Sequence, residues 1–181
     1  MASVTDIANF FIDASLSQKE DFLTNMKLNK LMYYAQAWCL VRYGKPLFKE
    51  TICAWKHGPV IPRVYNIYKP FISQPITIMK DPSYIYSLSQ EEEEILIDVM
   101  LNYGKLTASA LVNKTHVPGG PWEQTEQMKE IPQELIKAYF DSCPPMPSAR
   151  DLIAKSKGAI TPKRREDGLA LIPRELVDDW C

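Results

Sequence analysis

The sequence is poor in the residues on which most enzymes depend. Only two histidines, His57 and His116, occur in 181 residues, and no common nucleotide-binding, serine-hydrolase or zinc-protease motif is present. The remaining catalytic alternative is a thiol of Cys39 or Cys53 activated by His57. We disfavour it because Cys39 lies in an apolar run, where thiols are usually inert. We therefore predict a protein that is not an enzyme and needs no cofactor.

Cysteines and long apolar runs are also scarce. The four cysteines are far apart and form no CxxC pair, which predicts reduced thiols, and no common zinc-ligand spacing is present, so no metal site is expected. No stretch approaches the roughly 18 apolar residues of a membrane span, and the N-terminus lacks the positively charged leader of a secretory signal. These absences predict a cytoplasmic protein without a membrane partner.

The charges nearly cancel but are segregated along the chain. The net charge of −1 does not by itself indicate a class of binding partner. Residues 22–80 carry nine basic side chains and one acidic one, whereas residues 81–141 carry four basic and eleven acidic side chains. The two segments either fold against each other and neutralise, which we favour, or each presents its own charged face to a partner.

Proline is absent from the first 45 residues, and glycine occurs there only at Gly44, whereas the rest of the chain holds all fourteen prolines. This contrast predicts two uninterrupted helices. Ser3 and Asp6 can cap the first, and the second can run from a cap at Thr24 to Gly44. Because the second is apolar on nearly every face, we expect it to be the central, buried helix.

The remaining elements are predicted to be short. Residues 51–56 alternate like a strand, 57–59 are typical of a turn, and 75–79 and 84–88 are two further strand candidates that could pair. Helices are expected at 62–70, 89–104, 107–114, 132–140, after Ser148 and at 173–180. We predict a mainly α fold: a compact helical domain of about six to eight helices with a small β-hairpin or three-stranded sheet. Residues 1–142 would form this domain, and 143–181 a C-terminal extension after a proline-rich linker.

Residues 90–116 could be mistaken for a DNA-binding helix-turn-helix. The helix that would read DNA offers only Lys114 as a base, and the helix before it opens with four glutamates, which phosphate would repel. The basic, aromatic-rich segment 22–80 is the other feature typical of nucleic-acid binding. We expect no nucleic-acid partner, and keep a DNA-binding transcriptional regulator of a mobile element or prophage as the alternative.

Two loop junctions concentrate the side chains best suited to recognition. Each combines a tryptophan, a histidine and rigid turn residues, which hold side chains in place at low entropic cost. The candidate partner-binding residues are Trp55, Lys56, His57, Gly58, Pro59, Arg63, Tyr65, His116 and Trp122. A structural role is an equal alternative: the tryptophans would plug the core, and the histidines would satisfy buried carbonyls.

Four segments of the chain form a set of motifs. They are MKLNKLMYYAQAW at 26–38, WKHGPV at 55–60 followed by Val64-Tyr65, the segment 111–116, and Pro121-Trp122. In this order and spacing the motifs resemble the Panacea domain of SocA-like antitoxin and phage-associated proteins. The likeness spans about residues 5–140. It implies a mainly helical, non-enzymatic bacterial module that neutralises a cognate toxin encoded next to it. Neutralisation in this family is by direct protein–protein binding or, in one branch, by delivery to a protease of the AAA+ type.

The resemblance also implies that an additional region outside the shared domain contacts the toxin, which in this chain would be residues 143–181. Two surfaces could steer a toxin by charge. One is a basic face formed by Lys27, Lys30, Arg42, Lys45, Lys56 and Arg63, and the other is the acidic run Glu91–Glu94 with Asp98. The sequence does not choose between them.

Overall fold

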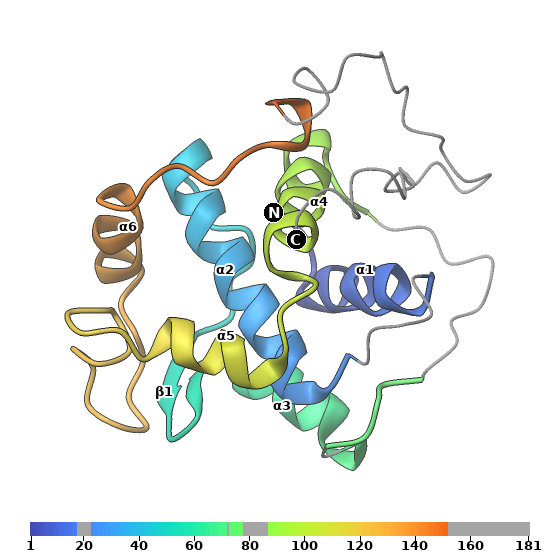
Figure 1. Cartoon of the computed structure of the whole chain (residues 1–181), viewed down its shortest axis with the longest axis horizontal. Coiled ribbons are helices and arrows are strands. Elements are labelled where there is room, and N and C mark those ends of the chain that lie inside the picture. The colour runs from blue at the N-terminus through green and yellow to red at the C-terminus, as the bar shows by residue number, and fades with distance from the viewer. Residues whose placement is uncertain (18–22, 72, 78–86, 152–181) are drawn as a thin grey trace.

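The computed structural model of the chain describes residues 1–17, 23–71, 73–77 and 87–151. Within them lie six α-helices, one 3-10 helix and one two-stranded antiparallel sheet (Figure 1). The elements are α1 (Val4–Ser17), α2 (Asn25–Tyr43), β1 (Cys53–Trp55), β2 (Gly58–Val60), α3 (Pro62–Tyr68), η1 (Lys69–Phe71), α4 (Gln90–Tyr103), α5 (Ala108–Thr115) and α6 (Gln133–Asp141). This confirms the predicted mainly α fold with a small β-hairpin. The terminal helix predicted at 173–180 lies outside the described residues.

Helix α2 is the centre of the fold and contacts each of the other five α-helices. It begins where the Thr24 hydroxyl accepts a hydrogen bond from the Lys27 N–H at 3.3 Å. It ends at Gly44, which adopts the left-handed conformation at φ +66° and donates its N–H to the Leu40 carbonyl at 3.1 Å. Every residue from Lys27 to Leu40 is buried. The prediction of a central, buried second helix is therefore confirmed.

Aromatic side chains fill the space between α2 and the helices on either side of it. Tyr34 of α2 stacks on Tyr103 of α4 with ring centroids 4.2 Å apart, and Trp38 meets Phe140 of α6 edge to face at 5.2 Å. Such contacts fix α4 and α6 against the central helix.

In the described part of the chain no single helix is long and apolar enough to cross a membrane, and only the bent pair of α4 and α5 meets that test jointly.

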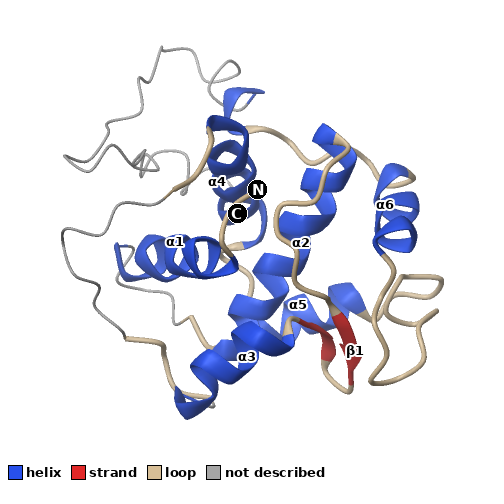
Figure 2. Cartoon of the chain, turned by 180° about the vertical axis from the view of Figure 1, so that it is seen from behind, coloured by secondary structure: helices blue, strands red, loops and turns tan. Residues whose placement is uncertain are grey.

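The hairpin differs from the predicted one in its register and its partner. Strand β1 pairs with β2, and the turn falls at Lys56 and His57 rather than at 57–59 (Figure 2). Of the strands predicted at 75–79 and 84–88, the described residues 75–77 and 87–88 form no strand, and the other residues lie outside the described part of the chain. The expectation that the turn includes Gly58 and Pro59 is wrong, because both residues pair with β1, opposite Trp55 and Ala54.

Pro59 is tolerated inside β2 because of the strand register. Ala54 lies opposite Pro59, and its own N–H and C=O point away from β2, toward the Lys129 carbonyl at 2.8 Å and the Met128 N–H at 2.7 Å. The Ala54–Pro59 pair is thus a non-hydrogen-bonded pair, in which the missing proline N–H costs nothing. A third segment, residues 128–131, therefore lies along the other edge of β1.

The basic and acidic segments of the chain meet at the end of α2 farthest from the hairpin (Figure 1). Arg42 pairs with Asp98 at 2.5 Å, and Lys45 pairs with Glu91. These contacts agree with the interpretation that the two segments neutralise each other. The alternative basic face does not form, because Lys27 and Lys30 are buried inside the fold.

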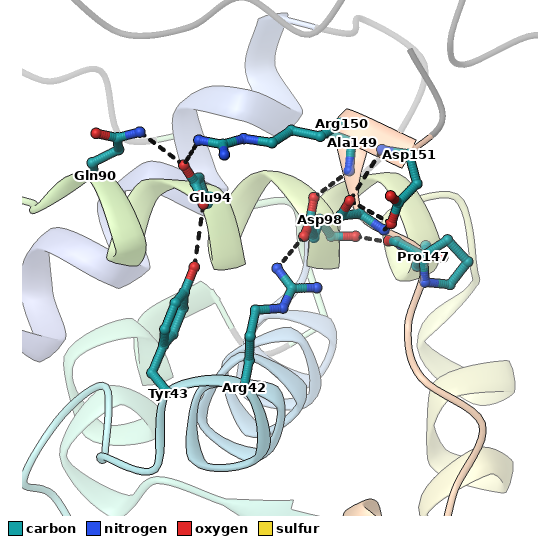
Figure 3. A network of polar contacts seen from close by, with 11 residues as sticks. Arg42, Tyr43, Gln90, Glu94, Asp98, Pro147, Ala149, Arg150 and Asp151 are labelled. Carbon is teal, nitrogen blue, oxygen red and sulfur yellow. Dashed lines mark hydrogen bonds and ion pairs between the residues drawn. The ribbon is translucent and has the colours of Figure 1, made fainter. Parts of the chain in front are cut away.

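Residues 147–151 lie beside α4, close to the Arg42–Asp98 pair (Figure 3). The Asp98 carboxylate accepts the Ala149 N–H at 2.6 Å, and the Asn102 amide donates to the Pro147 carbonyl at 3.0 Å. Arg150 reaches Glu94, and Met146 is buried in the core. The first part of the predicted extension is thus packed against the helical domain.

Candidate partner-binding site

The two loop junctions singled out in the sequence come together on one side of the molecule. The Trp122 indole donates its Nε1–H to the Trp55 carbonyl at 2.8 Å, which joins the segment after α5 to the hairpin. The His116 ring lies against Trp122 with centroids 3.6 Å apart, and Trp55 meets Tyr65 of α3 edge to face at 4.9 Å. Residues 67 positions apart in sequence therefore build one composite site.

Exposure divides the predicted site residues into two groups. Lys56, His57 and Arg63 are exposed, and the four rings of Trp55, Tyr65, His116 and Trp122 are half-buried, so a partner can reach all seven. Gly58 and Pro59 are buried. These two residues position the site and do not form its surface.

The predicted structural role, in which a histidine bonds a backbone carbonyl, applies to His116 and not to His57. The Val112 carbonyl lies 2.6 Å from His116 Nδ1, and because a carbonyl can only accept, Nδ1 carries the proton in this contact. His57 stands exposed at the tip of the hairpin turn. His116 therefore has a structural bond as well as a place in the site, whereas His57 is free to face a partner.

Polar side chains on α2 hold the hairpin junction from beneath, and the sequence reasoning missed this role. The Asn25 amide donates to the Tyr65 carbonyl at 3.0 Å, and Asn29 Oδ1 accepts the Ile61 N–H at 2.9 Å. Lys30 Nζ donates to the Pro59 carbonyl at 2.8 Å. Three polar residues in the first two turns of a helix that is expected to be buried are the signal that could reveal this support.

The environment of Lys30 is unusual for a lysine. Its side chain is 1% exposed, and burial lowers the pKa of its ammonium group from 10.5 to about 7. It lies beside Gly58, where an added Cβ would be 2.9 Å from Lys30 Cε and 2.7 Å from Thr115 Oγ1. Helix α2, strand β2 and the end of α5 thus meet at this one point.

The site offers little for nucleophilic or metal chemistry. Burial raises the pKa of Cys39 to about 11 and also raises that of Cys53, so both are thiols rather than thiolates near neutral pH. Among the described residues no cluster of three or more His, Cys, Asp or Glu could hold a metal ion. The arrangement of large amphipathic rings and exposed cations suits the binding of another protein.

The chain bends by 104° between α4 and α5, and a similar angle is found in helix-turn-helix units. The N-terminal acids of α4 are engaged within the fold, since Glu91 pairs with Lys45, and Glu92 closes a capping box with Ser89. On α5 the single basic residue is Lys114. This pair of helices therefore lacks the positive surface that a DNA-reading unit needs.

Replacing Trp122 by phenylalanine tests the bond that unites the site. We expect the loss of the indole N–H to lower the free energy of unfolding by about 1 kcal/mol, because the Trp55 carbonyl loses its donor. Urea unfolding measures this change. Trp38→Phe is the comparison variant. It makes the same chemical change outside the site, because it removes the indole bond to the Tyr103 hydroxyl at 3.0 Å in the helical core. Unchanged stability in Trp122→Phe would contradict the role assigned to the bond.

Comparison with known proteins places the sequence in a family. Residues 28–123, more than half of the chain, match the family model described as "Antitoxin SocA-like, Panacea domain". The chain is also 33% identical over 126 residues to Antitoxin SocA of Caulobacter vibrioides (strain NA1000 / CB15N). That match covers 65% of this chain and 66% of the relative, just under two thirds of the relative's length. No solved structure matches the chain.

The region matched by the family model begins inside α2 and ends one residue after Trp122. It contains Lys30, the hairpin and both aromatic junctions, so the composite site lies entirely within the shared domain. The chain belongs to the SocA-like antitoxin family defined by the Panacea domain.

Proposed function

We propose that this chain is an antitoxin that neutralises a cognate toxin, encoded next to it, by direct protein–protein binding in the cytoplasm. The observation that carries the proposal is the Trp122–Trp55 hydrogen bond, which joins two separate loops into one rigid surface. Aromatic rings at the centre and charged residues at the rim are the usual composition of a protein-binding hot spot. Family membership supports the antitoxin role.

In this proposal the protein acts as a binder and not as a catalyst. The toxin is held inactive by occlusion, with the half-buried rings at the centre of the contact and Lys56, His57 and Arg63 at its edge. Residues 1–142 would form the antitoxin domain, and residues 143–181 would add contacts outside it.

Expression of the adjacent gene tests the proposal. The neighbouring product alone should arrest growth, co-expression of this chain should relieve the arrest, and the two purified proteins should form a stable complex. Relief with rapid loss of the toxin and no stable complex would instead indicate delivery to a protease of the AAA+ type. Absence of toxicity from either neighbouring gene would contradict the antitoxin role.

Reversing charge at the hairpin tip tests the location of the contact. We expect the double variant Lys56→Glu/His57→Ala to bind the neighbouring gene product at least about tenfold more weakly, because both side chains are exposed at the site. Its melting temperature should stay unchanged, since neither side chain is buried. Isothermal titration calorimetry measures the affinity. Lys105→Glu, at an exposed lysine in the turn between α4 and α5, is the matched control and should bind normally.

The alternative function, a DNA-binding regulator, has one favourable feature in the 104° bend between α4 and α5. It requires a mobility shift of operator DNA at low salt that weakens steeply as salt is added. Because α5 carries one basic residue, we expect no such shift with DNA upstream of the chain's own gene at 50 mM salt.

A further inference from the structure

Met128 adopts a backbone conformation that suits glycine. Its φ is +68°, and it is the one non-glycine residue with a positive φ in the described part of the chain. A large side chain is rare in this region because its Cβ crowds the backbone. Asparagine and glycine are the residues that a fold normally places there.

The fold requires this conformation but not this side chain. The Met128 N–H donates to the Ala54 carbonyl at 2.7 Å, and the Lys129 carbonyl accepts the Ala54 N–H at 2.8 Å, so the turn is fixed by the edge of β1. The side chain itself is 62% exposed, so its packing contributes little to the stability of the protein. Glycine would fit the turn better, so methionine at this position has a cost to stability.

Met128 lies next to the composite site. Ala54, which holds its backbone, precedes Trp55, whose carbonyl accepts the Trp122 indole. The loops that carry Met128 and Trp122 lie beside the hairpin in both views (Figures 1 and 2). An unbranched, polarisable thioether adapts well to an apolar pocket on another protein.

We propose that Met128 is an anchor residue that inserts into an apolar pocket of the toxin. This inference rests on the proposed function and extends the contact surface beyond the residues assigned to it above. The exposed residues Glu126, Lys129 and Glu130 flank the methionine with charges of both signs. The pocket it fits is therefore apolar at its floor and bordered by charged groups of both signs.

The test separates strain from recognition with three variants of the full chain. Met128→Gly removes both the strain and the side chain, and should raise the melting temperature by about 2 °C or more. The same variant should bind the purified neighbouring gene product at least about tenfold more weakly. Met128→Ala keeps the strained Cβ, so it should lose affinity without gaining stability. Met128→Leu should retain most of the affinity.

Met26→Ala is the matched control, because Met26 is 39% exposed in the first turn of α2 and should not affect binding. Undiminished affinity of Met128→Gly, with normal binding by the unaltered chain, would overturn the anchor and leave the proposed function standing. A lower melting temperature in Met128→Gly would overturn the strain argument. No binding by the unaltered chain would overturn both proposals. Self-association that Met128→Gly abolishes would show that the occupant is a second copy of the chain.

Discussion

Gly58→Ala is expected to lower the free energy of unfolding by about 3 kcal/mol or more, because two separate costs fall on one methyl group. The first is conformational, since φ is +96° at this position and residues with a Cβ rarely adopt that angle. The second is steric. The new Cβ would lie 2.7 Å from Thr115 Oγ1 and 2.9 Å from Lys30 Cε, both in the interior. Urea unfolding monitored by tryptophan fluorescence measures the loss.

Gly44→Ala is the matched control for the conformational cost alone. Gly44 also has a positive φ, +66°, but an added Cβ there would meet no atom within 4 Å. We expect this variant to lose only about 1 kcal/mol. If both glycine variants had the same free energy of unfolding, the close approach of α2, β2 and α5 at Gly58 would not contribute to the cost of Gly58→Ala.

A double variant locates the steric part of the cost. Removing the hydroxyl and methyl of Thr115 in Gly58→Ala/Thr115→Ala should restore part of the stability lost by Gly58→Ala, because the nearest blocking atom is gone. The two substitutions should therefore be non-additive by about 0.5–2 kcal/mol. Thr115→Ala alone loses the hydrogen bond from Thr115 Oγ1 to the Val112 carbonyl, so it is measured beside the double variant. Additive effects would contradict the contact.

The parts of the fold that the sequence predicted correctly are specified by neighbouring residues. Thr24 and Gly44 delimit α2 as predicted, and the helix expected from residue 89 begins at a capping box formed by Ser89 and Glu92. Each signal acts over three or four positions and needs no tertiary partner. The ends of these helices can therefore be predicted from the sequence alone.

The parts that could not be predicted depend on residues far apart in the chain. The register of β1 is set by β2 on one side and by residues 128–131 on the other, some 75 positions away. Proline is typical of turns, and no neighbouring residue in the sequence shows that Pro59 occupies a strand position that needs no N–H. Both the register of β1 and the strand position of Pro59 depend on pairing between segments that the sequence does not show to be neighbours.

The candidate site shows the same division. Its residues were identified by their chemistry, but the bond from Trp122 to Trp55 that unites them was not. Met128 carries no sequence signal at all, because its positive φ is imposed by the edge of β1. Lys30 is buried and does not belong to the expected basic face, and the sequence does not reveal this because lysines are usually exposed.

Lys30→Met is expected to change how stability depends on pH. The pKa of Lys30 falls from 10.5 to about 7 in the folded protein. Between these values the unfolded chain binds a proton that the folded protein does not, so stability rises with pH in this range. Below about pH 7 both states are protonated, and the cost of burying the charge is at its full value. The methionine variant lacks this contribution.

The expected difference is large enough to measure. Between pH 7 and pH 9 the free energy of unfolding of the unaltered chain should rise by about 2 kcal/mol relative to that of Lys30→Met. Expressing the result as a difference between variants cancels other titrations, including that of Cys39, whose pKa burial raises to about 11. Lys105→Met, at an exposed lysine, should keep the slope of the unaltered chain. Parallel curves for Lys30→Met and the unaltered chain would contradict the argument.

The structural role of Lys30 is to donate a hydrogen bond to the Pro59 carbonyl. Methionine of similar length would remove the cost of burying an ammonium group but would leave the Pro59 carbonyl without its donor at 2.8 Å. We therefore expect Lys30→Met to be at least as stable as the unaltered chain at pH 7, yet to bind the neighbouring gene product more weakly. The lost bond fixes β2, whose residue Gly58 lies opposite Trp55 in the hairpin. Equal affinity of the two proteins would show that the hairpin keeps its position without Lys30.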